Sequence, residues 1–288
     1  MSLKIAQILA RDQARLIETL GLEKREARLE TQVLLSHALS VSKVFLIAHS
    51  DDHLLPEQEY RYTSLIERRL KGEPIAYILG EREFYSLPFK VTPAVLIPRP
   101  ETELLVELAL TYIAQDKPCQ VLDLGTGSGA VAITIAKHRP FSSLTAVDHS
   151  ADALAVAREN AAKLGVNAID FIQSDWYSAL SVKKFDIIVA NPPYISKNDP
   201  HLTQGDLRFE PRMALTDGQD GLACIRAIIA GASEHLMSNG MLFFEHGYDQ
   251  ASACQELLKQ HGFEQITSHS DLGGISRITC GRRKEILG

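Results

Sequence analysis

The stretch Val121-Leu-Asp-Leu-Gly-Thr-Gly-Ser-Gly129 joins a short apolar run to a glycine-rich turn. The segment that follows, Ala130–His138, has the spacing of apolar residues that is typical of a helix. A strand that passes through glycines into a helix is the first half of a β-α-β unit, whose strands lie parallel in one sheet. The stretch therefore predicts an α/β fold, with a ligand site expected at the glycine turn.

The chain downstream repeats this alternation. Further strands are expected at Leu144–Asp148, Ile169–Gln173, Phe185–Ala190 and Met241–Glu245. Further helices are expected at Ala151–Leu164, Gly221–Leu236 and Ala251–His261. Such alternation predicts a mostly parallel sheet with helices on both faces. Two apolar stretches between Phe263 and Cys280, on either side of a Gly-Gly pair, are compatible with an antiparallel closing hairpin.

The first hundred or so residues have a different pattern. Three stretches before Leu70 have helical spacing of apolar residues and no alternation of the strand type. Aromatic and β-branched residues broken by prolines then indicate a hairpin and a loop. We expect a helical domain at residues 1–75, a hairpin linker at 76–100 and the α/β domain at 101–288.

Composition argues against several classes of protein. The chain is 45% hydrophobic and 23% charged, and it contains no apolar run that is long enough to span a bilayer. Its four cysteines are scattered, which favours a reducing cytoplasm over a disulfide framework or a metal cage. The net charge of −6 lacks the basic excess that is usual in proteins that grip duplex nucleic acid. We expect a cytoplasmic protein with no metal, no membrane contact and no stable nucleic-acid binding.

The glycine turn consists of Gly125, Thr126, Gly127, Ser128 and Gly129. Taken alone, it is also compatible with a tight turn that binds nothing. Asp148 ends the next strand, where a carboxylate can accept hydrogen bonds from both hydroxyls of a ribose. The GxGxG spacing, with Asp123 inside the strand, differs from the GxGxxG of pyrophosphate binders. A ligand with a ribose but no pyrophosphate suits this loop, and S-adenosylmethionine is such a ligand.

The third strand ends in Ser174-Asp175-Trp176. Asp175 can accept a hydrogen bond from an adenine amino group, and the ring of Trp176 can stack on the base. The alternative is that Trp176 is a core residue at a strand end, because tryptophan is usually largely buried.

Asn191-Pro192-Pro193-Tyr194 directly follows the apolar strand at Phe185–Ala190, where an open α/β sheet binds its ligands. A turn that merely ends the strand is the alternative. The side-chain carbonyl of Asn191 and the backbone carbonyl of Pro192 can each accept one N–H bond of an amide or amino group. The two prolines fix the backbone, and Tyr194 can lie against the planar group.

Amide and exocyclic amino nitrogens are poor nucleophiles because their lone pair is delocalised. Two acceptors that hold both hydrogens aim the nitrogen at a methyl carbon, so alignment and electrostatic preorganisation supply the rate. This chemistry requires no metal and no strong general base. The residues therefore predict an S-adenosylmethionine-dependent methyltransferase that acts on a planar nitrogen.

Several motifs in order along the chain resemble one family. They are Gly80–Phe89, Val95–Glu103, Gln173–Trp176, Asn191–Ile195, Phe209–Pro211 and Glu245–Gly247. The chain resembles the protein-(glutamine-N5) methyltransferases that modify peptide release factors, the HemK/PrmC family. This implies a Rossmann-like class I methyltransferase sheet that binds S-adenosylmethionine, a small N-terminal all-α domain and a connecting β-hairpin. It also implies methylation of the glutamine in the Gly-Gly-Gln motif of class 1 release factors.

By this likeness the glycine turn, Asp148, Asp175, Trp176 and Asn191 bind the cofactor. The tetrapeptide from Asn191 to Tyr194 holds the glutamine, with Asn191, Pro192 and Tyr194 in catalytic roles. Three further residues are expected to line or brace the substrate site, namely Phe84, Arg99 and Glu101. The N-terminal helices are expected to contact the protein substrate.

Two other functions use the same motifs. A DNA or RNA adenine-N6 methyltransferase is one, although the acidic charge argues against it. A non-catalytic adaptor that senses S-adenosylmethionine and docks a partner through its helices is the other. His246, beside Glu245, is interpreted as a structural residue rather than a metal ligand, because the histidines have no ligand spacing.

Overall fold

The computed structural model describes residues 3–181 and 183–284. The chain divides into two compact units, which are described separately. One comprises Met1–Gly80 and Thr203–Phe209, and the other comprises Glu81–Leu202 and Glu210–Gly288. The helical unit thus continues past residue 75 and includes a segment that follows Asn191 in the chain.

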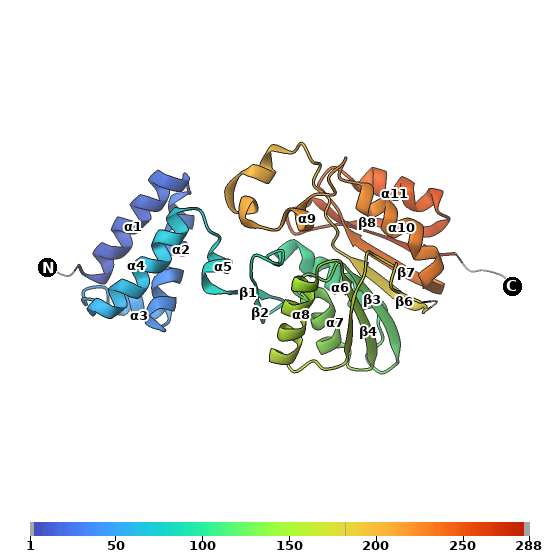
Figure 1. Ribbon diagram of the computed structural model, residues 1–288, viewed down its shortest axis with the longest axis horizontal. Helices are drawn as coiled ribbons and strands as arrows, with labels where there is room; N and C mark the ends of the chain where they lie inside the picture. The colour runs from blue at the N-terminus through green and yellow to red at the C-terminus, as the bar shows by residue number, and fades with distance from the viewer. Residues whose placement is uncertain (1–2, 182, 285–288) are drawn as a thin grey trace. The chain divides into compact units, whose positions relative to one another are not determined.

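The first unit is a small helical bundle (Figure 1). Its helices are α1 (Ile5–Leu20), α2 (Lys24–Leu39), α3 (Lys43–Ala48), α4 (Pro56–Leu70) and α5 (Ile75–Leu79). The three long helices coincide with the three stretches of helical spacing. The sequence did not predict α3 and α5, because helices of 6 and 5 residues are too short to show a period. Fully buried Ile8, Leu16, Leu34, Tyr62 and Ile66 belong to the core of this unit.

A buried ion pair joins two of these helices. Arg69 of α4 is 3% exposed, and its guanidinium donates to both carboxylate oxygens of Glu30 in α2, at 2.7 and 3.1 Å. The same side chain donates to Asp206 at 2.9 Å and to the carbonyls of Gly72 and Glu73. Burial raises the pKa of Glu30, and the hydrogen bond from Arg69 opposes that shift. Arg69 therefore ties α4 both to α2 and to the segment Thr203–Phe209.

We predict that Glu30→Ala lowers the free energy of unfolding by about 3–5 kcal/mol, because it leaves the Arg69 charge buried without its main partner. Urea unfolding provides the measurement. The control is Glu57→Ala, which removes an exposed pair with Arg61 at 3.8 Å and should cost under about 1 kcal/mol. Equal losses in the two variants would contradict the role given to Arg69.

The second unit is built on a seven-stranded sheet with the order β5-β4-β3-β6-β7-β9-β8. The strands are β3 (Cys119–Leu124), β4 (Ser142–Asp148), β5 (Ile169–Gln173), β6 (Phe185–Ala190), β7 (Leu236–Glu245), β8 (Phe263–Ser270) and β9 (Ser276–Arg283). The first five are parallel, and β9 runs antiparallel to both β7 and β8. The mostly parallel sheet and its closing antiparallel hairpin are thus confirmed.

Helices cover both faces of this sheet, as predicted (Figure 1). They are α6 (Glu103–Tyr112), α7 (Ala130–His138), α8 (Ala151–Lys163), α10 (Ala223–His235) and α11 (Ala251–Gln260). Successive strand residues point to opposite faces, so Val121 packs with α6 and α7 while Leu122 packs with α10 and α11. The near-continuous apolar strands are therefore explained by burial on both sides.

Short elements complete the chain. They are the hairpin strands β1 (Glu81–Phe84) and β2 (Leu87–Lys90), the 3-10 helices η1 (Pro100–Thr102), η2 (Pro200–Thr203) and η3 (Gly205–Phe209), and α9 (Arg212–Leu215). Fully buried Asn160 of α8 exchanges hydrogen bonds with the backbone of Lys90 and donates to the carbonyl of Ser128 at 2.9 Å. One amide thus anchors both the hairpin and the glycine turn. Across residues 3–181 and 183–284, every helix is too short or too polar to cross a membrane.

Candidate functional site

The register of the sheet brings the predicted motifs to one edge. Leu124, the last residue of β3, pairs with Ala190 at the end of β6 and with Val147 in β4. Gly125 and Asn191 therefore leave neighbouring strands side by side. The chain continues from β3 to β4 and β5 on one side and to β6 and β7 on the other. Such a reversal of strand order opens a crevice at the carboxyl ends of the strands.

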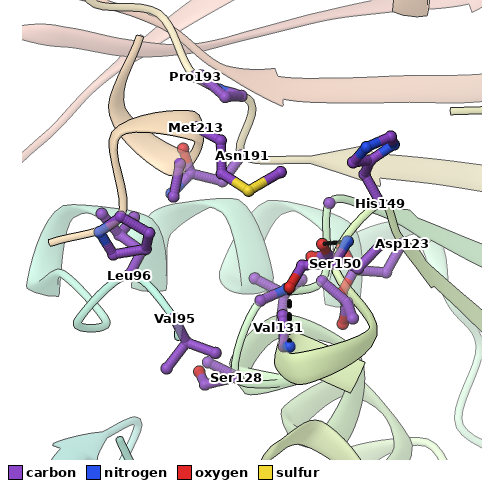
Figure 2. Close-up of a pocket in the computed structure, with 18 of the residues that line it drawn as sticks. Val95, Leu96, Asp123, Ser128, Val131, His149, Ser150, Asn191, Pro193 and Met213 are labelled. Carbon is purple, nitrogen blue, oxygen red and sulfur yellow. Dashed lines mark hydrogen bonds between the residues drawn. The ribbon is translucent and has the colours of Figure 1, made fainter. Parts of the chain in front are cut away.

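A cavity of about 310 Å³ lies at this edge (Figure 2). Eleven predicted residues line it: Phe84, Arg99, Gly125, Thr126, Gly127, Ser128, Asp148, Asp175, Trp176, Asn191 and Pro193. Four predicted residues, all in the described part of the chain, are not among the lining residues: Glu101, Gly129, Pro192 and Tyr194. Figure 2 shows Asn191, Pro193 and Met213 on one side of the cavity and Asp123, His149 and Ser150 on another.

The glycine turn needs its glycines for two different reasons. All three have positive φ, at 74° for Gly125, 55° for Gly127 and 82° for Gly129, a region that L-residues with a Cβ rarely adopt. At Gly129 a Cβ would also lie 2.7 Å from Cδ1 of Ile133 and 3.2 Å from Cβ of Ala157. Around Gly127 no atom lies within 4 Å of such a position. Gly129 therefore packs the turn onto the helices, while Gly127 leaves its backbone open to the cavity.

Asp148 fixes the shape of this turn. One carboxylate oxygen accepts from the backbone N–H of Gly127 at 2.8 Å, and the other accepts from that of Ser150 at 2.9 Å. Burial raises the pKa of Asp148, and these hydrogen bonds oppose the shift. Each oxygen has a further lone pair, so the carboxylate can also accept from a ligand in the cavity.

Asp123 is a residue of this site that the sequence motifs do not single out, although a carboxylate inside an apolar strand is a visible signal. It is 1% exposed, lines the cavity and accepts from the hydroxyl of Thr126 at 2.7 Å. Burial raises its pKa to about 7, and the nearby charge of Asp148 adds to the shift. The carboxyl group of Asp123, beside the glycine turn, therefore titrates near neutral pH.

Trp176 has an unusual backbone that its neighbours hold in place. Its φ is 47°, and the hydroxyl of Ser174 donates to its carbonyl at 2.8 Å while accepting from Ala179 N–H at 3.0 Å. A Cβ on Gly125 would lie 3.7 Å from the indole ring, so the ring lies next to the start of the glycine turn. The ring is only partly buried and lines the cavity, which leaves a face available for stacking.

A hydrogen-bonded chain supports the tetrapeptide. The side-chain N–H of Asn191 donates to the hydroxyl of Thr102 at 3.0 Å, and that hydroxyl donates to Glu245 at 2.6 Å. The phenol of Tyr194 donates to the other oxygen of Glu245 at 3.0 Å. Glu245 is 1% exposed, and burial raises its pKa. Thr102 and Glu245 were not predicted as site residues, although both lie within the motifs on which the family resemblance rests.

The loop that carries Arg99 is held by a second buried carboxylate. Glu210 is 4% exposed, forms an ion pair with Arg99 and accepts from the backbone N–H of Ile97 at 3.0 Å. Phe84, 1% exposed, packs edge-on against Phe89 in the hairpin and lines the cavity. These contacts let Arg99 and Phe84 form a fixed part of the wall.

His246 is fully buried, and its ring contacts the carbonyl of Gly247 and the hydroxyl of Thr279, both at 2.8 Å. Burial lowers its pKa. These contacts occupy both ring nitrogens, as a structural histidine requires. Over the described ranges, 3–181 and 183–284, no three histidine, cysteine or acidic side chains are grouped so as to hold a metal ion.

We predict that the free energy of unfolding of the wild-type protein falls as pH rises from about 4 to about 7, when it is compared with that of the Asp123→Asn variant. The folded pKa is raised above the unfolded value, so the folded state binds more protons in this window and stability falls as those protons are released. Urea unfolding at several pH values gives the difference in free energy between the two proteins.

The exposed Asp152→Asn variant is the matched control and should show no such trend. A difference between wild type and Asp123→Asn that stayed constant with pH would contradict the raised pKa of Asp123.

Comparisons with known proteins agree with this geometry. Residues 101–206 match the model of the methyltransferase small domain, and residues 13–80 match that of the PrmC N-terminal domain. The release factor glutamine methyltransferase of Burkholderia pseudomallei is 51% identical over 261 residues, which cover 88% of this chain and 91% of that protein. The Escherichia coli protein of the same name is 44% identical over 255 residues, covering 88% and 92%.

Among solved structures, the 16S rRNA N2 G1207 methyltransferase of T. thermophilus, solved with AdoMet and guanosine, matches with a TM-score of 0.55 at 19% identity. The match covers 71% of this chain and 50% of that one, and it supports the fold alone. Relatives that are this similar over nearly their whole length establish the family. The chain belongs to the release factor glutamine methyltransferases.

Proposed function

We propose that this chain transfers a methyl group from S-adenosylmethionine to the side-chain amide nitrogen of the glutamine in the Gly-Gly-Gln motif of class 1 peptide chain release factors. One observation carries the proposal: the glycine turn with Asp148, and the amide of Asn191, line the same cavity. The names of the relatives supply the substrate class.

The residues of the cavity fit S-adenosylmethionine. No Cβ at Gly127 obstructs a ligand, although the N–H of Gly127 already donates to Asp148, and Asp148 has further lone pairs for ribose hydroxyls. Asp175, Trp176 and Asn191 also line this cavity. In this assignment Asp175 and the partly exposed ring of Trp176 recognise the adenine, and Asn191 adjoins the methyl donor. When bound, S-adenosylmethionine supplies an electrophilic methyl group on a sulfonium.

The tetrapeptide accounts for the choice of nucleophile. The side-chain carbonyl of Asn191 and the backbone carbonyl of Pro192 each accept one N–H bond of the glutamine amide. Holding both hydrogens directs the nitrogen lone pair along one line and favours pyramidalisation, so positioning supplies much of the rate. Pro193 keeps the backbone rigid. Tyr194 is assigned a contact with the amide plane in this proposal, although it is not among the residues that line the cavity and its phenol donates to Glu245. The extra proton leaves after attack, and no strong base is required.

Other residues shape the approach of the substrate. Phe84 and Arg99 line the wall. Glu101 is kept as a residue of the substrate site on the strength of the family resemblance alone. The N-terminal helical domain, residues 1–75, contacts the release factor. The reaction takes place in the cytoplasm, where release factors act, and does not depend on stable binding to nucleic acid.

The test uses tritiated S-adenosylmethionine and unmethylated release factor, either wild type or with the Gly-Gly-Gln glutamine changed to alanine. Label in the wild-type factor alone is expected. Label in neither factor, with nucleic acid labelled instead, would move the assignment to an adenine-N6 methyltransferase. Cofactor binding without transfer to any release factor would favour the non-catalytic adaptor.

We predict that Asn191→Ala lowers kcat by about a hundredfold or more, because the substrate nitrogen loses an acceptor that aligns it. Cofactor affinity, measured by calorimetry, should change little. Equal loss of turnover and cofactor binding would mean instead that Asn191 mainly supports the fold of the loop.

Asp148→Ala should act on the other half of the site. We predict a rise of about tenfold to a hundredfold in the cofactor dissociation constant, since hydrogen bonds to a charged group are lost. Asp152→Ala, on the exposed face of α8 close in sequence, should leave the constant unchanged. Unaltered affinity in Asp148→Ala would contradict the ribose role.

A further inference from the structure

Asn191 is hydrogen-bonded to Thr102, and Thr102 is in turn hydrogen-bonded to Glu245. Thr102 lies in η1 and lines the cavity, whereas Glu245 ends β7 and is buried beneath it. The distances are 2.6 Å from the Thr102 hydroxyl to Glu245 and 3.0 Å from the Asn191 amide nitrogen to Thr102. Three side chains from three separate parts of the chain thus form one continuous line of hydrogen bonds, which ends at the cavity.

The donors on either side of Glu245 give this line a direction while Glu245 is ionised. Thr102 and Tyr194 both donate to Glu245, and an ionised carboxylate only accepts hydrogen bonds, so the single proton of Thr102 points to Glu245. The oxygen of Thr102 is then left with lone pairs alone, and it can only accept from Asn191. The NH₂ group of Asn191 must therefore face Thr102, and its carbonyl oxygen is turned away from Thr102.

The same carboxylate fixes the neighbouring ring. Its second oxygen accepts from the phenol of Tyr194 at 3.0 Å, so both acceptor atoms are engaged. Gln250 also donates to the backbone carbonyl of Tyr194 at 3.0 Å and to that of Gly221 at 3.2 Å. A Cβ on Gly221 would lie 2.5 Å from the Tyr194 carbonyl, so this packing leaves the loop little freedom to shift. Reversal of the Asn191 amide would therefore change the polarity presented to the substrate without a shift of the loop.

We propose that Glu245, acting through Thr102, is a positioning residue that presents the carbonyl oxygen of Asn191 to the substrate and so selects a nitrogen that donates hydrogen bonds. The inference rests on the proposed function, and it adds the source of the preference for a carboxamide over a carboxylate. A glutamate side chain in place of the target glutamine would bring a carboxylate oxygen against the carbonyl oxygen of Asn191. Two buried acceptors with no proton between them are unfavourable.

Two substitutions remove the fixed direction of these hydrogen bonds and leave Asn191 itself unchanged. Glu245→Gln keeps the shape but introduces an amide that can donate to Thr102, which frees the threonine proton to point at Asn191. Thr102→Val keeps the volume and deletes the hydroxyl. Thr102→Ser retains the hydroxyl and is the conservative variant. Thr111→Val, on the exposed surface of α6, removes a hydroxyl that donates to the carbonyl of Leu108 and is the matched control.

The measurement is binding rather than turnover. Affinity for the release factor is measured by fluorescence anisotropy, for a factor with glutamine and for one with glutamate at the target position, with thermal unfolding as the check on folding. The two release factors differ only at the target residue, so their other contacts with the protein contribute equally to both dissociation constants. The ratio of these constants therefore reports the preference of the site for glutamine over glutamate. Wild type, Thr102→Ser and Thr111→Val should prefer glutamine by at least about tenfold. In Glu245→Gln and Thr102→Val the preference should fall to about threefold or less.

The outcomes separate this inference from the proposed function. A wild-type protein that binds neither factor, or transfers no label to the release factor, contradicts the proposed function. A wild-type protein that prefers glutamine, with Thr102→Val and Glu245→Gln keeping the full ratio, overturns the positioning role alone. If Glu245→Gln fails to fold, Thr102→Val against Thr102→Ser decides the question.

Discussion

The parallel pairing of β3 with β4 and β6 is the constraint on which the site depends. Because Leu124 lies opposite both Val147 and Ala190, the residues that follow these strands emerge together at one edge. The glycine turn and Asn191 are far apart in sequence and become neighbours only through this register. A slip by one residue would send the apolar side chains of the strand to the wrong faces, so the two buried cores hold the register.

Much of this arrangement could be predicted from the sequence because its signals are local. The strands and the long helices have clear periods, and the glycine turn and the tetrapeptide occur at strand ends, where ligands bind. The roles of individual side chains at this site stay predictions. The apolar runs predict the type of each element more accurately than its first and last residues. For example, β7 begins at Leu236 rather than at Met241.

The features that could not be predicted depend on contacts between distant residues. The place of Thr203–Phe209 in the helical unit involves the contact of Arg69 with Asp206, which no local pattern encodes. The pairing of Thr102 with Glu245 likewise joins η1 to the end of β7. Each residue is ordinary in its own segment. Their significance comes from burial, since a polar group that is removed from water must find a partner inside the protein.

Carboxylates at the ends of the strands show how that requirement organises the site. Asp123 accepts from Thr126, Asp148 accepts from Gly127 and Ser150, and Glu245 accepts from Thr102 and Tyr194. In each case a carboxylate, fully buried in Asp123 and Glu245 and half-buried in Asp148, orders the loop that follows its own or a neighbouring strand.

Burial raises the pKa of all three carboxyl groups, so ionising each of them costs more free energy here than in water. Apolar residues would have no means of orienting the polar groups of the loops. Because an ionised carboxylate can only accept, it fixes which way each neighbouring donor points, and the cavity inherits a defined pattern of donors and acceptors. The raised cost of ionising these carboxyl groups therefore accompanies the ordered pattern of donors and acceptors at this edge of the sheet.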